Sequence, residues 1–450
     1  MFEPQKVPQH LRSDVPQTHL SRRTFLERAL AVGIGSSVAL PLLNACGGSG
    51  PQANITFWNL FTGGDGERMV EMEKTFSQST PNINLKSVTL SWGEPYYTKI
   101  AMAAAGNGAP DAAIMHMSRL PTYAGSGLLE PFDESMLAPL GITSQSFLAP
   151  IWQQAHFNGK LYALPLDTHP FVMYYNTDIC KKAGLLDAAG KLKPLQGTEA
   201  LLDAFKRAKQ VTGNIGLSLD AQDVNPWRPF LALYTQLGGK VVSPDGKHIL
   251  LDTNKADQVL SFLRDLTITS KVASPALDSA GSTAVFGSGQ AGFFWNGEWE
   301  LPTFQAQKLP FNMVPFPNVF GGNQTWADSH SFVLPRQSSS DPTRRQATLQ
   351  FISTMLKNSL TWAKGGHIPA YLPVATSSAY KNLKPQANYA SDAQNVVFDP
   401  PAWYSGAASE LQTQAGAAFQ GVLGGQQAPQ AGLAQFRTAL EHLADIPRPF

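Results

Sequence analysis

The stretch Ile55-Thr56-Phe57-Trp58 decides the fold, because it alternates like a β-strand and a helical pattern follows it directly. In residues 65–79 the apolar side chains recur on one helical face until Pro81 ends the run. A second strand pattern begins at Ile83, and a second helical pattern occupies residues 94–105. Strands that alternate with helices of this length form crossover units, so we predict an α/β fold with a mostly parallel sheet.

The loops that follow the strand patterns are where a ligand is expected. In open α/β sheets, ligands bind at the carboxyl ends of the strands. The loops just after Trp58, Met115 and Leu164 are therefore the first places to look for binding residues.

The composition excludes several classes of protein. At 450 residues the chain has room for about three domains or two large ones. Its 34 Lys and Arg residues balance 33 Asp and Glu residues, so no field of one sign exists to bind nucleic acid. The two cysteines, Cys46 and Cys180, are too few for a disulfide framework or an all-cysteine metal site.

The first 45 residues have the pattern of an export signal. Ser21-Arg22-Arg23-Thr24-Phe25-Leu26 is a twin-arginine signature, and the uncharged stretch 29–43 is too short to span a bilayer. Residues 43–46 resemble a lipobox that ends at Cys46. We predict a signal peptide at 1–45, a tether at 46–53 and a lipid on Cys46 that anchors the protein outside the cytoplasm. A plain secretory leader with an incidental cysteine is the alternative.

Five groups of short motifs carry a resemblance to a known family. They are Ile55–Trp58, Gly108–Asp111, Tyr123–Leu129, Gly159–Pro165 with Tyr174–Asn176, and Gly297-Glu298-Trp299. In order and spacing they resemble extracellular solute-binding proteins of ABC importers, within the sugar-binding group (family 1 type) that contains maltose-binding protein. The resemblance covers residues 54–445.

The resemblance implies a two-lobed fold with a ligand cleft between the lobes and several hinge crossings. One lobe would take residues 54–167 and 325–374, and the other would take 168–324 and 375–450. It also implies a sugar or oligosaccharide ligand, ABC permease subunits as membrane partners, a monomer, no cofactor and no catalysis. The hinge would lie near 168–171, 323–328 and Pro373.

A sugar site combines aromatic rings, which stack on C–H faces, with polar groups that bond hydroxyls. On this chemistry and on the resemblance, Trp299 is the expected stacking residue, with Asn296 and Glu298 beside it. The full set of predicted ligand-binding residues is Trp58, Asn59, Thr62, Asp65, His116, Ser118, Asp167, His169, Trp227, Asn296, Glu298, Trp299, His367 and Tyr371.

Several of these residues have an equally plain structural explanation. Asp65 is as well suited to cap a helix as to bind a ligand. Asp167 is as well suited to form a hydrogen bond within the hinge as to contact the ligand. Ser118 stands where relatives often have a sugar-binding acid, which weakens any transfer of disaccharide specificity. Trp227 and Arg228 stand in a predicted loop that could close over the ligand.

Two further expectations come from the same family comparison of motifs. The loop at 365–371, which supplies His367 and Tyr371, resembles a late binding loop but lacks the arginine often present there. Ligand binding is also possible for three further tryptophans, although packing in the core is the favoured interpretation: Trp326, Trp362 and Trp403.

The sequence lacks the motifs of several enzyme classes and leaves two other functions as alternatives. Gly287–Gly292 matches a dinucleotide fingerprint but precedes the apolar run 293–295, and the chain has no GxxxxGK[ST], GxSxG or HExxH motif, so we predict no cofactor and no metal. A glycosidase would need two carboxylates about 5–10 Å apart. The candidates are Asp65, Asp167, Glu298 and Asp328. A binding protein for polyamine, iron or phosphate is the third possibility.

Overall fold

The computed structural model describes residues 53–339 and 341–448. The predicted signal peptide, Cys46 and almost all of the predicted tether lie outside these residues. Within them, no helix combines the length and the apolar composition that a membrane span requires.

The first sheet, which we take to define lobe 1, has the strand order β2-β1-β3-β13-β4, with β7 also paired to β13. β1 is parallel to both β2 and β3, whereas β13 is antiparallel to β3. The strands are β1 (Ala53–Asn59), β2 (Ile83–Thr89), β3 (Ala112–His116), β4 (Leu129–Glu130), β7 (Ala163–Pro165) and β13 (His330–Pro335). The parallel pairs follow from the strand–helix alternation of the sequence.

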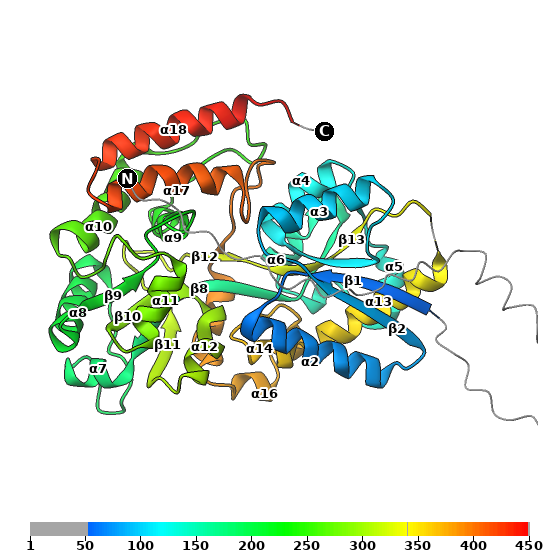
Figure 1. Ribbon diagram of the computed structural model, residues 1–450, viewed down its shortest axis with the longest axis horizontal. Helices are drawn as coiled ribbons and strands as arrows, with labels where there is room; N and C mark the ends of the chain where they lie inside the picture. The colour runs from blue at the N-terminus through cyan, green and yellow to red at the C-terminus, as the bar shows by residue number, and fades with distance from the viewer. Residues whose placement is uncertain (1–52, 340, 449–450) are drawn as a thin grey trace, which may run out of the picture. The chain divides into compact units, whose positions relative to one another are not determined.

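Helices cover both faces of this sheet. α3 and α4 lie on one side, and α2 and α13 lie on the other (Figure 1). Phe57 of β1 packs on Phe351 of α13 with ring centroids 5.0 Å apart. The helical elements are α2 (Gly63–Ser79), α3 (Glu94–Ala105), η1 (Met117–Arg119), α4 (Leu120–Gly125), α5 (Glu134–Leu137), η2 (Ala138–Leu140), η3 (Ser144–Ser146), α6 (Ala149–Gln154), α13 (Pro342–Lys357) and α14 (Ser359–Ala363). A small hairpin joins β5 (His156–Phe157) to β6 (Lys160–Leu161).

The second sheet, which defines lobe 2, has the order β15-β12-β8-β10-β9, with β11 and β14 also paired to β8. The long strand β8 is antiparallel to β10, β11, β12 and β14. The strands are β8 (Asp167–Asn176), β9 (Ile215–Leu219), β10 (Ala291–Gly297), β11 (Phe311–Pro315), β12 (Thr325–Asp328), β14 (Ile368–Pro369) and β15 (Val396–Val397).

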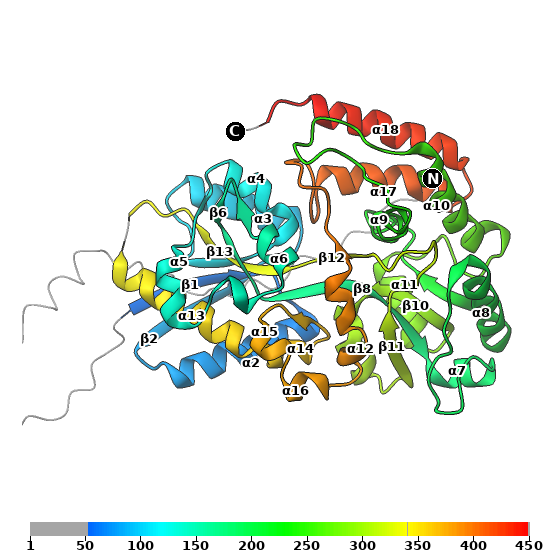
Figure 2. The ribbon, with the colours of Figure 1, turned by 180° about the vertical axis from the view of Figure 1, so that it is seen from behind.

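Helices also surround the second sheet, and the pair α17–α18 packs beside α9 and α10 (Figure 2). The helical elements are α7 (Thr177–Lys182), α8 (Gly197–Thr212), α9 (Trp227–Gln236), α10 (Thr253–Arg264), the π-helix η4 (Asp265–Thr269), α11 (Ser279–Gly287), η5 (Glu298–Glu300), α12 (Leu301–Ala306), α16 (Ser378–Lys381), η6 (Gln386–Asn388), η7 (Ala390–Gln394), α17 (Glu410–Leu423) and α18 (Pro429–Asp445). The short helix α15 (Leu372–Ala375) follows β14 and packs against α14 and η3 of lobe 1. Cys180 is a free, buried thiol in the core of this lobe.

The chain crosses between the two sheets at three neighbouring segments. Leu166 joins β7 to β8, Ser329 joins β12 to β13, and residues 364–367 join α14 to β14. Pairing of β8 with β12 and β14 holds these segments together. The predicted lobe boundaries and hinge positions stay predictions, because both sheets draw on strands at these crossings.

Candidate ligand-binding site

A cavity of about 620 Å³ lies between the two lobes. Lobe 1 contributes the loop after β1, the end of β3 and the start of β13, while lobe 2 contributes the segments around α9, η5 and β12. This volume falls within the range of roughly 300–1,000 Å³ that is usual for small-molecule sites. The loops after Trp58 and Met115 therefore lie where the sheet topology predicts binding residues.

Five of the residues predicted from the sequence line this cavity. They are Thr62, Asp65, His116, His169 and Trp299. Thr62 is the N-cap residue of α2, yet its side chain makes no capping hydrogen bond, so its hydroxyl is free for a ligand. Trp299 is partly exposed, as a stacking residue has to be.

Trp299 and Trp326 form an aromatic wall in lobe 2. Their ring centroids are 6.4 Å apart and the rings are nearly perpendicular, at 86°. Gly297 makes room for this arrangement, since a Cβ atom there would lie 1.8 Å from Cζ3 of Trp299. The Gly-Glu-Trp motif thus has a steric cause: only glycine lets the indole fold back over the backbone of residue 297.

Arg228 from α9 completes this wall. Its guanidinium carbon lies 5.5 Å from the ring centroid of Trp299 and 5.0 Å from that of Trp326. Contacts of this length are cation–π contacts, which orient the guanidinium without using its N–H donors. Lobe 2 therefore offers the ligand aromatic faces and one positive charge.

Histidines line the cavity beside this wall. Nδ1 of His116 lies 2.6 Å from the hydroxyl of Tyr97, and His169 and His330 both place Nδ1 against Asp167. Burial lowers the pKa of His169 to about 3, and neighbouring His330 adds to this effect. Because a carboxylate only accepts, Nδ1 of neutral His169 carries the proton and Nε2 is left as an acceptor.

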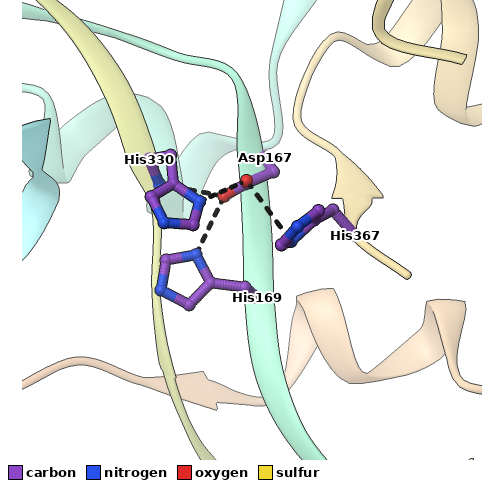
Figure 3. A group of neighbouring side chains, drawn as sticks. All are labelled: Asp167, His169, His330 and His367. Atoms are coloured by element: carbon purple, nitrogen blue, oxygen red, sulfur yellow. Dashed lines mark hydrogen bonds and ion pairs between the residues drawn. The ribbon is translucent and has the colours of Figure 1, made fainter. Parts of the chain in front are cut away.

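The Asp167 cluster occupies the crossing segments (Figure 3). Oδ1 of Asp167 accepts from Nδ1 of His169 (3.0 Å) and from the amide of His330 (2.9 Å). Oδ2 accepts from Nδ1 of His330 (2.7 Å) and Nε1 of Trp362 (2.6 Å). Burial opposes the charge on Asp167, but His330 and His169 hold the pKa of this carboxyl well below its usual range.

Asp167, His169, His330 and His367 also form a group with the residue types of a metal site, and their ligand atoms lie within 4.8 Å of one another. The hydrogen bonds decide against that use. Asp167 already accepts four N–H groups, which fills its lone pairs, and the facing Nδ1 atoms carry protons. Asp167 and its donors His169, His330 and Trp362 form a hydrogen-bonded group across the crossing segments, which we call the clasp.

His367 extends the clasp from one lobe to the other. Its Nδ1 donates to Oε1 of Glu298 in lobe 2, and its Nε2 donates to Oδ1 of Asp65 in lobe 1, both at 2.9 Å. Burial acts to lower the pKa of His367, but Asp65 and Glu298 together raise it well above its usual value. Burial likewise raises the pKa of Glu298 to about 7. The predicted residues Asp167, Glu298 and His367 therefore lie in the clasp and not on the cavity wall.

Three other predicted residues lie in the lobes away from the cavity. Trp58 is half-buried, with the Lys99 ammonium 5.6 Å from its ring centroid. Trp227 is fully buried and donates from Nε1 to Asp399 at 2.8 Å. The hydroxyl of Tyr371 donates to the carbonyl of Gly141 at 3.1 Å.

The remaining three are buried hydrogen-bonding residues. Asn59 accepts from the amide of Phe61 at 3.1 Å, which fixes the loop after β1. Asn296 accepts from the amide of Gly297 at 2.8 Å. Ser118 donates to Asp328 and accepts from the amide of Ala407, so it ties lobe 1 to lobe 2 without lining the cavity.

Some cavity residues were not in the predicted set. Trp92 lines the rim and is 44% exposed, and Trp326 lines the wall at 3% exposure. Arg228 also lines the cavity, whereas the predicted ligand-binding set contains only its neighbour Trp227. An exposed tryptophan flanked by Ser91 and Gly93 is a signal that could have revealed Trp92.

Most of the chain matches a known protein family. The model of the bacterial extracellular solute-binding proteins matches residues 71–395. The chain belongs to this family. The predicted resemblance is thereby confirmed, and the family is one that works outside the cytoplasm.

Individual relatives are more distant. The arabinooligosaccharide-binding protein of Bacillus subtilis (strain 168) is 28% identical over 233 residues, which is 51% of this chain and 50% of the relative. The chain thus matches about half the length of this curated relative.

Among solved structures, the GacH receptor of Streptomyces glaucescens GLA.O, known unliganded and with acarbose, matches with a TM-score of 0.75 and 21% identity. The match covers 88% of this chain and 99% of that receptor. Maltose-bound MalE3 of T. maritima gives a TM-score of 0.73 and 20% identity, over 87% and 100%. These matches confirm the predicted two-lobed α/β fold of this solute-binding protein.

Proposed function

We propose that the protein is the saccharide receptor of an ABC importer, without catalysis of its own. The observation that carries the proposal is the cavity between the lobes, where the partly exposed indole of Trp299 stands beside hydroxyl-bonding groups. This pairing of ring and polar group is what a sugar requires. The oligosaccharide ligands of the relatives support the same class of ligand for this chain.

Each side of the cavity has its own part in binding. Trp299 stacks on a sugar C–H face, and Nε2 of His169 accepts a hydrogen bond from a sugar hydroxyl. At the start of α2, the Thr62 hydroxyl and the free backbone amides of the first turn donate to sugar oxygens. A ligand that contacts both lobes stabilises the closed arrangement over an open one by the difference in its contacts.

Closure would use the crossing segments as a hinge. Leu166, Ser329 and residues 364–367 are the covalent links between the sheets, and the clasp around Asp167 fixes their register. The closed form would dock on a membrane permease, whose ATPase partners supply the energy. The receptor acts as a monomer, held at the outer face of the cell membrane by a lipid on Cys46.

An enzyme of the glycosidase type fits the site less well. Asp167, Glu298 and Asp328 do not line the cavity. Asp65 does, but its Oδ1 accepts from His367. Asp223, another acid of the cavity, is exposed. The solute-binding family is a family of binding proteins, which agrees with this assignment.

Isothermal titration calorimetry tests the proposal. The protein is titrated with arabino-, malto- and manno-oligosaccharides and with their monosaccharides, and at least one is expected to bind. Trp299→Ala should weaken that binding by about 1–3 kcal/mol, through loss of the stacking face. Trp152→Ala, which removes an indole stacked on Phe147 outside the cavity, should leave the affinity unchanged. Hydrolysis of a sugar without stable binding would contradict the proposal.

A further inference from the structure

Arg228 is a cation in the cavity wall whose N–H donors have no acceptor. It is the only Lys or Arg among the described residues that line the cavity. Nε of Arg228 is buried and has no hydrogen-bond partner. No carboxylate oxygen of the described residues lies within ion-pairing distance, 4.0 Å, of its guanidinium. A buried donor that lacks a partner marks a place where something else belongs.

The acids that compensate this charge act from a distance. Asp220, Asp399 and Asp328 each favour the charged form of Arg228, but none of the three lines the cavity. The oxygens of Asp399 accept from Trp227, Trp326 and Gln412. These acids make a buried guanidinium tolerable without occupying its N–H groups.

Asp328 is engaged in the same way, whereas Asp220 is engaged through one oxygen only. Asp328 accepts from Ser118 and from the amide of Ser329. One oxygen of Asp220 accepts from Ser282, and its other oxygen has no partner. None of the three acids therefore accepts a hydrogen bond from Arg228, which lines the cavity.

The acids of the cavity itself do not take this place. Oδ1 of Asp65 is bonded to His367, and Asp223 is exposed at the rim. Burial, then the charges of Asp220 and Asp65, raise the pKa of Glu300 to about 7, so its surroundings already repel a further negative charge there. Among the charged side chains of the cavity, Arg228 is therefore the one that favours an anionic group.

The chemistry of arginine indicates which anion fits. Its planar fork of donors matches a carboxylate with two parallel hydrogen bonds, and charge-assisted bonds of this kind are about twice as strong as neutral ones. One carboxylate matches the donors of one guanidinium, whereas a phosphate dianion would need further donors. The partly exposed indole of Trp299, which lies beside the guanidinium, would pack on the ring that bears the carboxylate.

We propose that the ligand is an acidic saccharide, in which the carboxylate of a uronic acid residue binds Arg228 and its sugar ring packs on Trp299. This inference rests on the proposed saccharide receptor and narrows its substrate class from sugars in general to uronate-containing oligosaccharides. Arg228 is then a specificity-determining residue.

Paired titrations test the proposal on the unaltered protein. Trimers of galacturonate, glucuronate and mannuronate are each compared with the same trimer after reduction of its carboxyl groups to alcohols. One acid trimer should bind roughly 10–100-fold more tightly than its reduced partner, with affinity falling as salt is raised. Equal affinity within every pair, or binding by neutral sugars alone, would overturn the acidic ligand and leave the saccharide receptor intact. Binding by no saccharide would overturn both.

Variants assign the effect to Arg228. Arg228→Gln should lose roughly 10–100-fold in affinity for the acid trimer and less than about threefold for the reduced one. Arg228→Lys keeps the positive charge but lacks the planar pair of N–H donors. Its affinity for the acid trimer should lie between that of the unaltered protein and that of Arg228→Gln. Arg207→Gln removes a partly exposed cation on α8, which lies outside the cavity and donates to the carbonyl of Ala183, and should change neither affinity. Equal losses for both trimers in Arg228→Gln would overturn the proposal, and if this variant does not fold, the paired titrations still decide.

Discussion

Two buried polar centres lie close to the cavity and differ in one respect. Around Asp167, both carboxylate oxygens accept two N–H groups each. Around Arg228, the guanidinium lies over two indole rings, and its buried Nε has no acceptor. A centre whose hydrogen bonds are complete holds the chain in place, whereas an incomplete one has capacity for a ligand. On this ground we propose a structural role at the crossing segments for Asp167 and a ligand-binding role for Arg228.

The largest expected effect lies at the complete centre. Asp167→Ala should lower the free energy of unfolding by about 3–5 kcal/mol, because it leaves the N–H groups of His169, His330 and Trp362 buried without an acceptor. Urea denaturation measures this loss. Asp203→Ala, which removes an exposed carboxylate paired with Arg207 on α8, should cost less than about 1 kcal/mol. Similar losses in the two variants would show that the four hydrogen bonds to Asp167 contribute no more than an exposed ion pair, and would contradict its structural role.

A smaller effect is expected from the backbone behind the aromatic wall. In Gly297→Ala the added methyl group would overlap the ring of Trp299 and displace it from the wall. Ligand affinity should fall by roughly tenfold, as expected when a stacking ring is lost. Calorimetric titration with the best ligand measures it. An affinity equal to that of the unaltered protein would show that the position of Trp299 does not govern binding.

Glu298 provides a pH test, since one of its oxygens bonds to His367 and the other has no partner. Burial raises its pKa to about 7 in the folded protein, so between pH 5 and 7 the folded state holds a proton that the unfolded state has released. This carboxyl therefore makes stability decrease as pH rises through that window.

Glu298→Gln removes this titrating carboxyl, so the free energy of unfolding of the variant should fall less from pH 5 to pH 7 than that of the unaltered protein. The difference between the two proteins should change by about 1–3 kcal/mol in favour of the variant across this window. Urea midpoints at both pH values measure the change. A constant difference between the two proteins across the window would contradict the prediction.

The smallest effect is expected at the rim of the cavity. Trp92 lines the cavity but is 44% exposed, so its ring shields the ligand from water on one side only. Trp92→Ala should weaken binding about two- to fivefold, less than Trp299→Ala, because exposed rim contacts contribute less than buried central ones. Titration of both variants with one ligand gives the order. The reverse order would place the centre of the site at Trp92.

The fold could be predicted from the sequence because its determinants are local. The strand–helix alternation from Ile55 to residue 105 gives the parallel pairs of β1, and the ordered motifs point to the two-lobed family. The position of Trp299 could be predicted for the same reason, since Gly297 and the indole are two residues apart.

The direction of individual side chains could not be predicted in the same way. Trp227 and Arg228 are consecutive, but successive side chains on a helix point about 100° apart, and the packing of α9 turns Trp227 into the core and Arg228 to the cavity. Asp167, Glu298 and His367 are polar residues of the expected types near the cleft. Only the three-dimensional arrangement shows that they bond to one another or to their neighbours.

A crystal structure of the protein with the tightest-binding saccharide tests the central claim most directly. The account predicts a sugar ring on Trp299, a ligand oxygen pair on the guanidinium of Arg228, and the four hydrogen bonds to Asp167 unchanged. A ligand bound to Asp167 in place of its histidines, or one bound outside the cavity with Arg228 still unpaired, would contradict it.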